Sequence, residues 1–352
     1  MANENHITNL DSNNTLNHLF CDCPEKIALD KRHRFPYRPF YFAFTPKKQR
    51  QAQKYQVDLI QKQQLANDWR IFLQAYFAKQ LPLFEIKPKK EFAHQKIIWQ
   101  YWGQGIDDDL PDVVKLCFQS VDKHKADFTV IRLDDNNLND YLELPAFINQ
   151  KRKNPEFKPA FFADLLRLAL LYHYGGVWLD ATILLTAPID EMLLEQEFFM
   201  FSRDEQAENQ DFWQAFNPDY FGWHKGHYVN ILNSFIIAKK GNEWVKDCLQ
   251  ILLNFWHTQN HIPHYFFFQV MFDVLQQEYG HHYQDFLKKD DTMTHLLIAT
   301  INEPFDQTAY QQILSKTNIH KLTYIKNCKA GSYYEQLRQE IFGLENIKST
   351  LI

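Results

Sequence analysis

The segment from Tyr172 to Thr182 constrains the fold of this chain more than any other stretch of the sequence. A very apolar run precedes it, and the adjacent glycines Gly175 and Gly176 indicate that a helix ends there and the chain turns. The apolar residues that follow predict a short buried strand that ends at Asp180. Because open α/β sheets bind ligands at the carboxyl ends of their strands, Asp180 is the first candidate for a functional residue.

The sequence upstream predicts a parallel strand–helix–strand unit. Residues 96–102 (KIIWQYW) have the composition of a strand, and Gly103 and Gly105 follow at once in a loop that needs backbone freedom. Pro111 opens a helical pattern, and residues 128–133 (FTVIRL) form a second strand pattern. A strand, a helix and a strand at this spacing are typical of an α/β fold.

A helix that is apolar on nearly all sides is predicted over residues 158–171, and we expect it to be buried. Within it, Asp164 and Arg167 are three positions apart and therefore lie on one stripe of the helix. A buried charge is costly unless it is paired or used. Two interpretations stay open: a mutual ion pair, or at least one side chain that faces a polar ligand.

The composition excludes several classes of protein. With 352 residues, of which 45% are hydrophobic, the chain can bury a large core, which excludes a disordered protein. Its formal net charge is −5, so nucleic acid is not an expected partner. The five cysteines are irregularly spaced and favour a cytoplasmic protein. We expect no signal peptide and no membrane span, so any membrane contact would be peripheral, at the inner face.

The pattern along the chain predicts three regions. Residues 1–94 are expected to form an accessory, mostly helical region, residues 95–330 the α/β domain, and residues 331–352 a helical tail. The run at residues 87–90 (KPKK) closes the first region. It is interpreted as a solvated linker, with contact to acidic lipid as the alternative.

The carboxylate of Asp180 is suited to two kinds of ligand. It can bind a divalent metal, or it can accept hydrogen bonds from the hydroxyls of a ribose. The alternative is that Asp180 only caps the turn that follows the strand. Thr182, two residues later, offers a neutral hydroxyl, which is a far weaker metal ligand than a carboxylate.

Four motifs, in the order found here, resemble glycosyltransferase family 32, and more closely the bacterial capsular polysaccharide synthesis proteins within that group. They are the run from Ile97 to Gly103, Asp164-x-x-Arg167, the run from Leu171 to Asp180, and residues 320–323 (HKLT). The resemblance covers about residues 95–325. The ordered set is far more specific than any motif alone.

The resemblance implies a GT-A-type fold over residues 95–330, with a mixed, mostly parallel sheet flanked by helices and an N-terminal helical extension. It also implies a retaining hexosyltransferase or N-acetylhexosaminyltransferase with a nucleotide-sugar donor, taken here as a UDP-sugar. The acceptor would be a saccharide or a lipid-linked saccharide in capsule or surface polysaccharide synthesis. A non-catalytic nucleotide-sugar-binding partner protein and a hydrolase of the same donor are the alternatives.

The resemblance assigns roles to residues by their position. Asp180 takes the place of the first Asp of the family's Asp-x-Asp motif, and Arg167 is expected to brace the nucleoside or the sugar; these two are the predicted catalytic residues. The predicted donor-binding residues are Trp99, Gln100 and Tyr101 beside the nucleobase, Asp164 at the nucleoside, and Gly176, Thr182, His320, Lys321 and Thr323.

Thr182 stands where the family usually has a second Asp that ligates a metal, so two accounts of the leaving diphosphate stay open. In the first, Mn²⁺ or Mg²⁺ is held by Asp180 and the diphosphate oxygens, with His320 as a further ligand. In the second, Lys321 and a protonated His320 supply the positive charge, and Thr323 donates a hydrogen bond.

Overall fold

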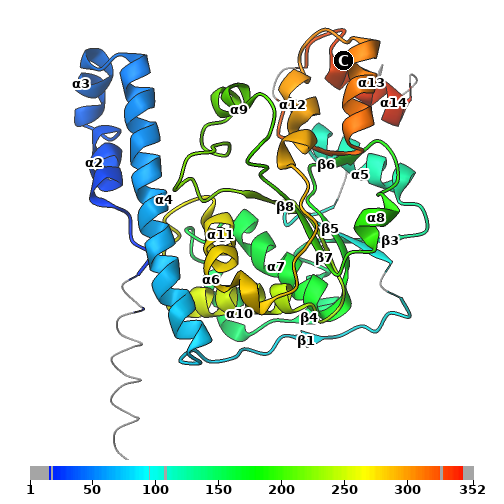
Figure 1. The fold of residues 1–352 in the computed structure, drawn as a ribbon, viewed down its shortest axis with the longest axis horizontal. Helices are drawn as coiled ribbons and strands as arrows, with labels where there is room; N and C mark the ends of the chain where they lie inside the picture. The colour runs from blue at the N-terminus through cyan, green and yellow to red at the C-terminus, as the bar shows by residue number, and fades with distance from the viewer. Residues whose placement is uncertain (1–15, 17–18, 95, 107–108, 326–327, 344–352) are drawn as a thin grey trace, which may run out of the picture.

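The computed structural model describes residues 16, 19–94, 96–106, 109–325 and 328–343, and a five-stranded mixed sheet lies at its centre (Figure 1). The strand order is β3-β2-β5-β8-β7. The strands are β2 (Ile97–Tyr101), β3 (Thr129–Leu133), β5 (Gly176–Leu179), β7 (Phe198–Ser202) and β8 (Ile231–Ala238). β2 is parallel to β3 and to β5, whereas β8 is antiparallel to β5 and to β7. The predicted α/β class is confirmed, with a mixed sheet.

The predicted strand–helix–strand unit forms one side of this sheet. β2 leads through α5 (Asp112–His124) to β3, and the two strands run in parallel with Ile97 opposite Thr129. Helix α5 is amphipathic and buries Val114, Cys117 and Val121. The spacing of these apolar residues is what predicted the helix.

The main core lies between the sheet and four helices. These are α4 (Lys47–Phe77), α7 (Pro159–Tyr174), α10 (Glu243–Thr258) and α11 (Phe267–Tyr279). Helix α7 is buried along most of its length, as its nearly uniform apolar sequence predicts. Helix α4 reaches into the same core, where the indole Nε1 of Trp69 donates to the carbonyl of Phe267 at 3.1 Å.

The two glycines that follow α7 set its position relative to β5. Gly175 has φ 71° and Gly176 has φ 104°, a region of backbone conformation that favours glycine, and the chain reverses direction there. Going back from Tyr174 to Asp164 along the helix covers roughly 15 Å, and β5 covers roughly the same length in the opposite sense. The reversal therefore brings Asp164 level with the carboxyl end of β5, where Asp180 lies.

A second, smaller core lies at the other end of the molecule (Figure 1, upper right). It contains residues of α5, of the C-terminal helices and of β6, which pairs with β9 in a two-stranded antiparallel ribbon. The elements at this end are β6 (Ile183–Leu185), β9 (Ile319–Lys321), α12 (Leu296–Thr300), α13 (Gln307–Lys316) and α14 (Tyr333–Phe342). In α14, which falls in the predicted C-terminal tail, the hydroxyl of Tyr334 donates to Asp112 at 2.8 Å. Residues 344–352 lie outside the described residues.

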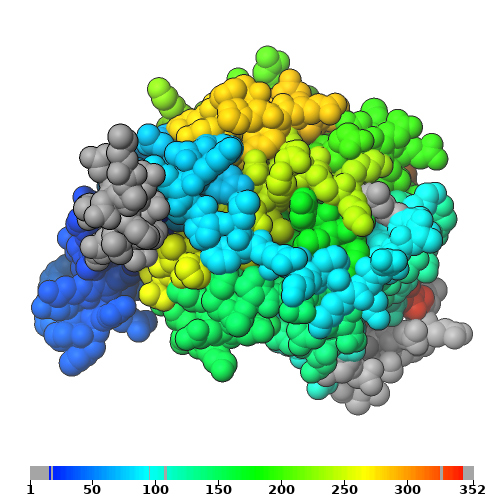
Figure 2. Space-filling model, turned by 90° about the horizontal axis from the view of Figure 1, so that it is seen from below, coloured from blue at the N-terminus to red at the C-terminus, as the bar shows by residue number. Residues whose placement is uncertain are grey.

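The N-terminal region contains α2 (Pro24–Arg32) and α3 (Tyr37–Phe44), which lie on the outer side of α4 (Figures 1 and 2). Helix α4 of this region packs into the main core. The predicted boundary at residue 94 stays a prediction. The run predicted as a linker instead forms β1 (Lys87–Pro88), which pairs with β4 (Leu142–Glu143). Its lysine side chains are exposed, as expected, but backbone pairing fixes the segment across the surface of the molecule.

The remaining short elements connect these layers. They are η1 (Leu138–Asp140), α6 (Ala146–Lys151), α8 (Glu191–Leu194), α9 (Gln210–Phe216), η2 (Gly280–His282) and η3 (Asp291–His295). Among the described residues, no helix combines the length and the apolar character that crossing a bilayer requires.

Candidate functional site

The structure gathers Asp164 and Arg167 of α7, together with Asp180, which follows β5, around one cleft at the carboxyl end of β5. The volume of the cleft is about 170 Å³. Its walls come from the end of β2, the N-terminal half of α7, the residues after β5, and β8 with the segment that leads into α11. Its polar and aromatic lining includes Tyr101, Asp164, Arg167, Trp178, Asp180, Thr182, Asn233, Tyr265 and Gln269.

The guanidinium of Arg167 joins the two carboxylates of the cleft. Its Nη1 lies 2.7 Å from Oδ1 of Asp164, and its Nη2 lies 3.1 Å from Oδ1 of Asp180. The Arg167 side chain is 4% exposed and lies over the indole ring of Trp178. The sequence left open an ion pair or a ligand-facing role for Asp164 and Arg167. The ion pair is present, and both residues also line the cleft.

The carboxylate of Asp180 is held ionised by its neighbours. Burial alone would raise its pKa, but the charges of Arg167 and Lys321 and a hydrogen bond from Trp178 outweigh burial and hold the pKa below its ordinary value. The Trp178 indole donates to Oδ1 at 2.7 Å, and the Lys321 ammonium lies 3.5 Å from Oδ2. These partners are side chains from β5, α7 and β9, rather than the backbone of the turn that Asp180 was alternatively expected to cap.

Asp164 is in a different electrostatic state from Asp180. Its side chain is 9% exposed, and burial raises its pKa to about 7, assisted by the negative charge of Asp180 and opposed by Arg167. The amide of Asn233 donates to Oδ1 of Asp164 at 2.8 Å, and Gln269 donates to Asn233 at 3.0 Å. The cleft therefore holds one carboxylate that is ionised at neutral pH and one that titrates near it.

Lys321 and His320 point to opposite sides of β9. Lys321 donates to the hydroxyl of Thr182 at 2.6 Å. His320 is fully buried, and its Nε2 lies 3.1 Å from Oγ1 of Thr186. Successive side chains of a strand alternate in direction, so the two residues cannot share one ligand. Burial lowers the pKa of His320 to about 3, which disfavours its predicted role as a cation. The direction of its side chain disfavours its predicted role as a metal ligand beside Asp180.

Two of the residues predicted beside the nucleobase are core residues instead. The Trp99 side chain is fully buried, and its indole donates to the carbonyl of Gly175 at 2.9 Å. Gln100 is also fully buried and accepts from Nε of Arg132 at 3.0 Å. Of the predicted trio, Tyr101 lines the cleft, at the carboxyl end of β2. Both side chains are buried because β2 is covered on both faces, so the structure gives no support to their predicted place beside the nucleobase.

Gly176 and Thr323 also lie away from the cleft. Gly176 begins β5, at the end opposite to Asp180, and lines a different hollow with Ile98 and Ala238. Thr323 is exposed, two residues beyond the end of β9. Neither residue belongs to the lining of the cleft, so the arrangement gives no support to their predicted donor contacts.

Sequence reasoning missed several residues of the cleft. Asn233 is a buried polar residue inside the apolar strand β8, which was a usable signal because such a residue needs a partner. Gln269 donates to Asn233, which in turn donates to Asp164, so the three side chains form one chain of hydrogen bonds. Tyr265 is 63% exposed and stands beside Phe161 at the mouth of the cleft. No local sequence signal separates Tyr265 from the neighbouring aromatic residues.

The residues beside Asp180 do not fit a divalent cation. The Thr182 hydroxyl, which would be the second ligand, already accepts from the Lys321 ammonium, and that ammonium also faces Asp180. Within the described ranges, no cluster of three or more His, Cys, Asp or Glu side chains is arranged to hold a metal ion. The Lys321 ammonium thus lies beside Asp180 and Thr182, where a metal ion held by these two residues would have to lie.

Comparison with known proteins gives the family. Residues 48–337 match the family model described as capsular polysaccharide synthesis protein. The chain belongs to this family. A stretch of 179 residues, 49% of this chain, is 27% identical to the "O-glycosyltransferase braB" of Annulohypoxylon truncatum, and it spans 40% of that protein's length. The solved structure "PaToxG Glycosyltransferase" is 16% identical, with 80% of this chain and 98% of that chain covered, at a TM-score of 0.30, which is too distant to carry an argument.

The match to the capsular polysaccharide synthesis family reaches further toward the N-terminus than the four sequence motifs do. It begins at residue 48, at the start of α4, and ends at residue 337, within α14. It therefore includes the helix that packs into the main core and excludes α2 and α3.

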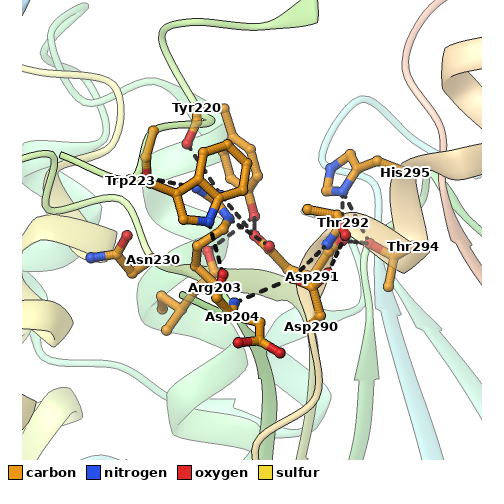
Figure 3. A network of polar contacts seen from close by, with 12 residues as sticks. Arg203, Asp204, Tyr220, Trp223, Asn230, Asp290, Asp291, Thr292, Thr294 and His295 are labelled. Carbon is orange, nitrogen blue, oxygen red and sulfur yellow. Dashed lines mark hydrogen bonds and ion pairs between the residues drawn. The ribbon is translucent and has the colours of Figure 1, made fainter. Parts of the chain in front are cut away.

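A second buried polar network of this capsular polysaccharide synthesis protein holds two long connections together (Figure 3). Nε and Nη2 of Arg203 lie 2.7 and 2.9 Å from the two carboxylate oxygens of Asp291. The hydroxyl of Tyr220 donates to the same carboxylate at 2.8 Å. Asp291 is fully buried, and Arg203 holds its pKa below the ordinary value against the opposing effect of burial. None of these three residues lines the cleft.

Proposed function

We propose that this chain is a retaining glycosyltransferase of GT-A type that moves a hexose or N-acetylhexosamine from a UDP-sugar to a saccharide or lipid-linked saccharide acceptor in capsule or surface polysaccharide synthesis. Membership of the capsular polysaccharide synthesis family and the printed name of the fungal relative support the reaction class. The α/β sheet with a carboxylate at the end of a central strand supports the GT-A assignment.

The observation that carries the proposal is the Arg167 guanidinium held between Asp164 and Asp180 in the wall of the cleft. The two ion pairs of Arg167 fix the guanidinium and both carboxylates in position before any ligand binds. The carboxylate of Asp180, whose side chain is 25% exposed, can accept hydrogen bonds from the hydroxyls of a ribose or a donor sugar. Tyr101 and Trp178 supply aromatic walls to the same cleft.

The reaction needs a positive charge where the diphosphate departs. The bond between the anomeric carbon and the diphosphate oxygen breaks, and its electron pair stays on the diphosphate. The acceptor hydroxyl forms the new glycosidic bond and gives up its proton to the departing diphosphate or to solvent. We assign the stabilising charge to Lys321, whose side chain is 21% exposed and lies beside Thr182 and Asp180.

The experiment that tests the proposal measures UDP release. The purified chain is incubated with a panel of UDP-sugars, with and without saccharide acceptors, and free UDP and glycosylated product are quantified. We expect one donor to release UDP in an acceptor-dependent manner. UDP release without an acceptor would indicate a hydrolase, and no release from any UDP-sugar of the panel would overturn the proposed transfer.

A non-catalytic nucleotide-sugar-binding partner protein is the second candidate. The observation that favours it is that Asp180 already has Arg167, Trp178 and Lys321 as partners within the chain. In that case UDP-sugars would bind, as measured by calorimetry, yet no UDP would be released with any acceptor. Binding and release measured on the same preparation therefore separate the two candidates.

A further inference from the structure

The segment from residue 31 to residue 54 has a charge unlike that of the rest of the chain. It contains no Asp or Glu, although the whole chain has a formal net charge of −5. We call this segment, which spans the end of α2, α3 and the start of α4, the basic aromatic patch. Its basic residues are Lys31, Arg32, Arg34, Arg38, Lys47, Lys48, Arg50 and Lys54.

The same patch exposes large apolar side chains. Phe35 is 90% exposed, Phe44 is 81% exposed and Phe40 is 66% exposed. Helix α3 buries none of its residues. Single exposed apolar residues are ordinary on a protein surface, but several on one short helix mark a binding face.

The patch is a shaped element of the fold. The hydroxyl of Tyr41 donates to Gln53 at 2.9 Å, which ties α3 to α4. Arg50 donates to the carbonyl of Phe42 at 3.3 Å and stacks on its ring at 4.4 Å. Of the basic residues in the patch, Lys54 is the one with a carboxylate partner among the described residues, Asp219. The other positive charges are therefore available to a ligand.

We propose that the basic aromatic patch docks this protein on an anionic lipid surface. Exposed Phe side chains gain free energy by entering the boundary between headgroups and acyl chains, and lysine and arginine side chains pair with anionic headgroups. A second copy that docked patch to patch would bring like charges together, which disfavours a dimer through this face. Helices α2 and α3, which contribute to the patch, lie on the outer side of α4 (Figure 1). The proposal is independent of the transferase activity.

The experiment uses the full chain and sedimentation with vesicles. We expect the wild-type chain to sediment with vesicles of phosphatidylcholine and phosphatidylserine, to stay in solution with phosphatidylcholine alone, and to be released by high salt. Each basic residue near such a surface contributes roughly a fivefold factor in partitioning. The charge variant Arg34→Gln/Lys47→Gln/Lys48→Gln is therefore expected to lose at least about tenfold in binding.

The apolar variant Phe35→Ser/Phe40→Ser/Phe44→Ser tests insertion separately from charge. We expect it to lose at least about tenfold in vesicle binding while its thermal midpoint is unchanged, because the substituted side chains are exposed. Matched controls place the same substitutions on exposed residues elsewhere. They are Phe212→Ser/Phe216→Ser and Lys125→Gln/Lys153→Gln/Lys288→Gln.

The outcomes separate the kinds of partner. Loss of vesicle binding in both patch variants, with binding retained in both controls, supports the proposal. Absence of wild-type binding to the anionic vesicles overturns it, and so does equal binding by wild type and patch variants. A patch-dependent dimer in sedimentation velocity, or patch-dependent binding of a single-stranded oligonucleotide without vesicle binding, would likewise overturn the lipid assignment.

Discussion

The ammonium group of Lys321 lies 2.6 Å from the hydroxyl oxygen of Thr182, so the end of β9 delivers a positive charge directly to the segment that follows β5. Asp180, two residues before Thr182, faces the same ammonium. This pairing couples two parts of the chain that are far apart in sequence, and it determines how the cleft is expected to handle a negatively charged ligand.

The first prediction concerns metal. Because Lys321 already supplies a cation beside Asp180 and Thr182, we expect UDP to bind with the same affinity in EDTA and in Mn²⁺, as measured by calorimetry. The double variant Thr182→Asp/Lys321→Ala replaces the ammonium by a second carboxylate and is expected to bind UDP more tightly with Mn²⁺ than without it. A wild-type affinity that collapses in EDTA would contradict the role given to Lys321.

The second prediction concerns Lys321 itself. Substituting Lys321→Met keeps most of the apolar stem and removes the charge, so UDP affinity should fall by about 10–100-fold, the range for a lost charge-assisted hydrogen bond. Lys316→Met is the matched control, because that lysine lies on the preceding helix α13 and is half exposed. Equal losses in the two variants would indicate a general effect of net charge.

The third prediction concerns Asp180. The variant Asp180→Asn keeps the size of the side chain but removes the charge that pairs with Arg167, so transfer should fall by about 100-fold or more. Circular dichroism should show an unchanged fold, since an amide can still accept from Trp178. Asp122→Asn, at a largely exposed carboxylate, is the control. Full activity in Asp180→Asn would mean that Asp180 is structural.

The fourth prediction is a pH dependence. Asp164 has a pKa of about 7 in the folded chain against an ordinary value of 3.8. Between these values the folded state binds more protons than the unfolded state, so this group lowers the free energy of unfolding as pH rises from about 4 to about 7. Relative to Asp164→Asn, the wild type should lose roughly 2–4 kcal/mol across that range in urea unfolding. A constant difference between the two proteins would contradict the raised pKa.

The fifth prediction concerns the network around Arg203. The variant Asp291→Asn leaves a guanidinium that is 3% exposed without its paired carboxylate, and it should cost about 3–5 kcal/mol of stability in urea unfolding. Asp285→Asn, at an exposed position in the preceding segment, should change stability by less than about 0.5 kcal/mol. Similar small effects in both variants would show that Arg203 finds another partner or water.

The part of the cleft that the sequence predicts is the part built from neighbouring elements. Asp164, Arg167 and Asp180 belong to a helix and a strand joined by two glycines, so helical spacing and strand direction suffice to bring them together. The strand–helix–strand unit could be predicted for the same reason, because each of its elements has a clear local period.

The part that the sequence did not predict depends on distant pairing. Which of His320 and Lys321 contacts Asp180 and Thr182 is decided by the register of β9 on β6, and a strand of three residues carries no periodicity from which to read it. Trp99 and Gln100 were assigned by resemblance, but side chains distant in sequence, such as Tyr174 against Trp99 and Arg132 against Gln100, decide their burial. Asn233 comes from β8, whose pairing with β5 is also non-local.

The antiparallel ribbon of β6 and β9 has a consequence for the newly made chain. Lys321 lies 139 residues beyond Thr182. Strand β6 therefore cannot pair with β9 until those residues have been translated. A ribosome-bound chain that already contains α7, β5 and Asp180 therefore lacks the ammonium group beside them. Under the function proposed here, high-affinity nucleotide binding appears late in synthesis, and chains truncated before β9 do not compete with the finished protein for the donor.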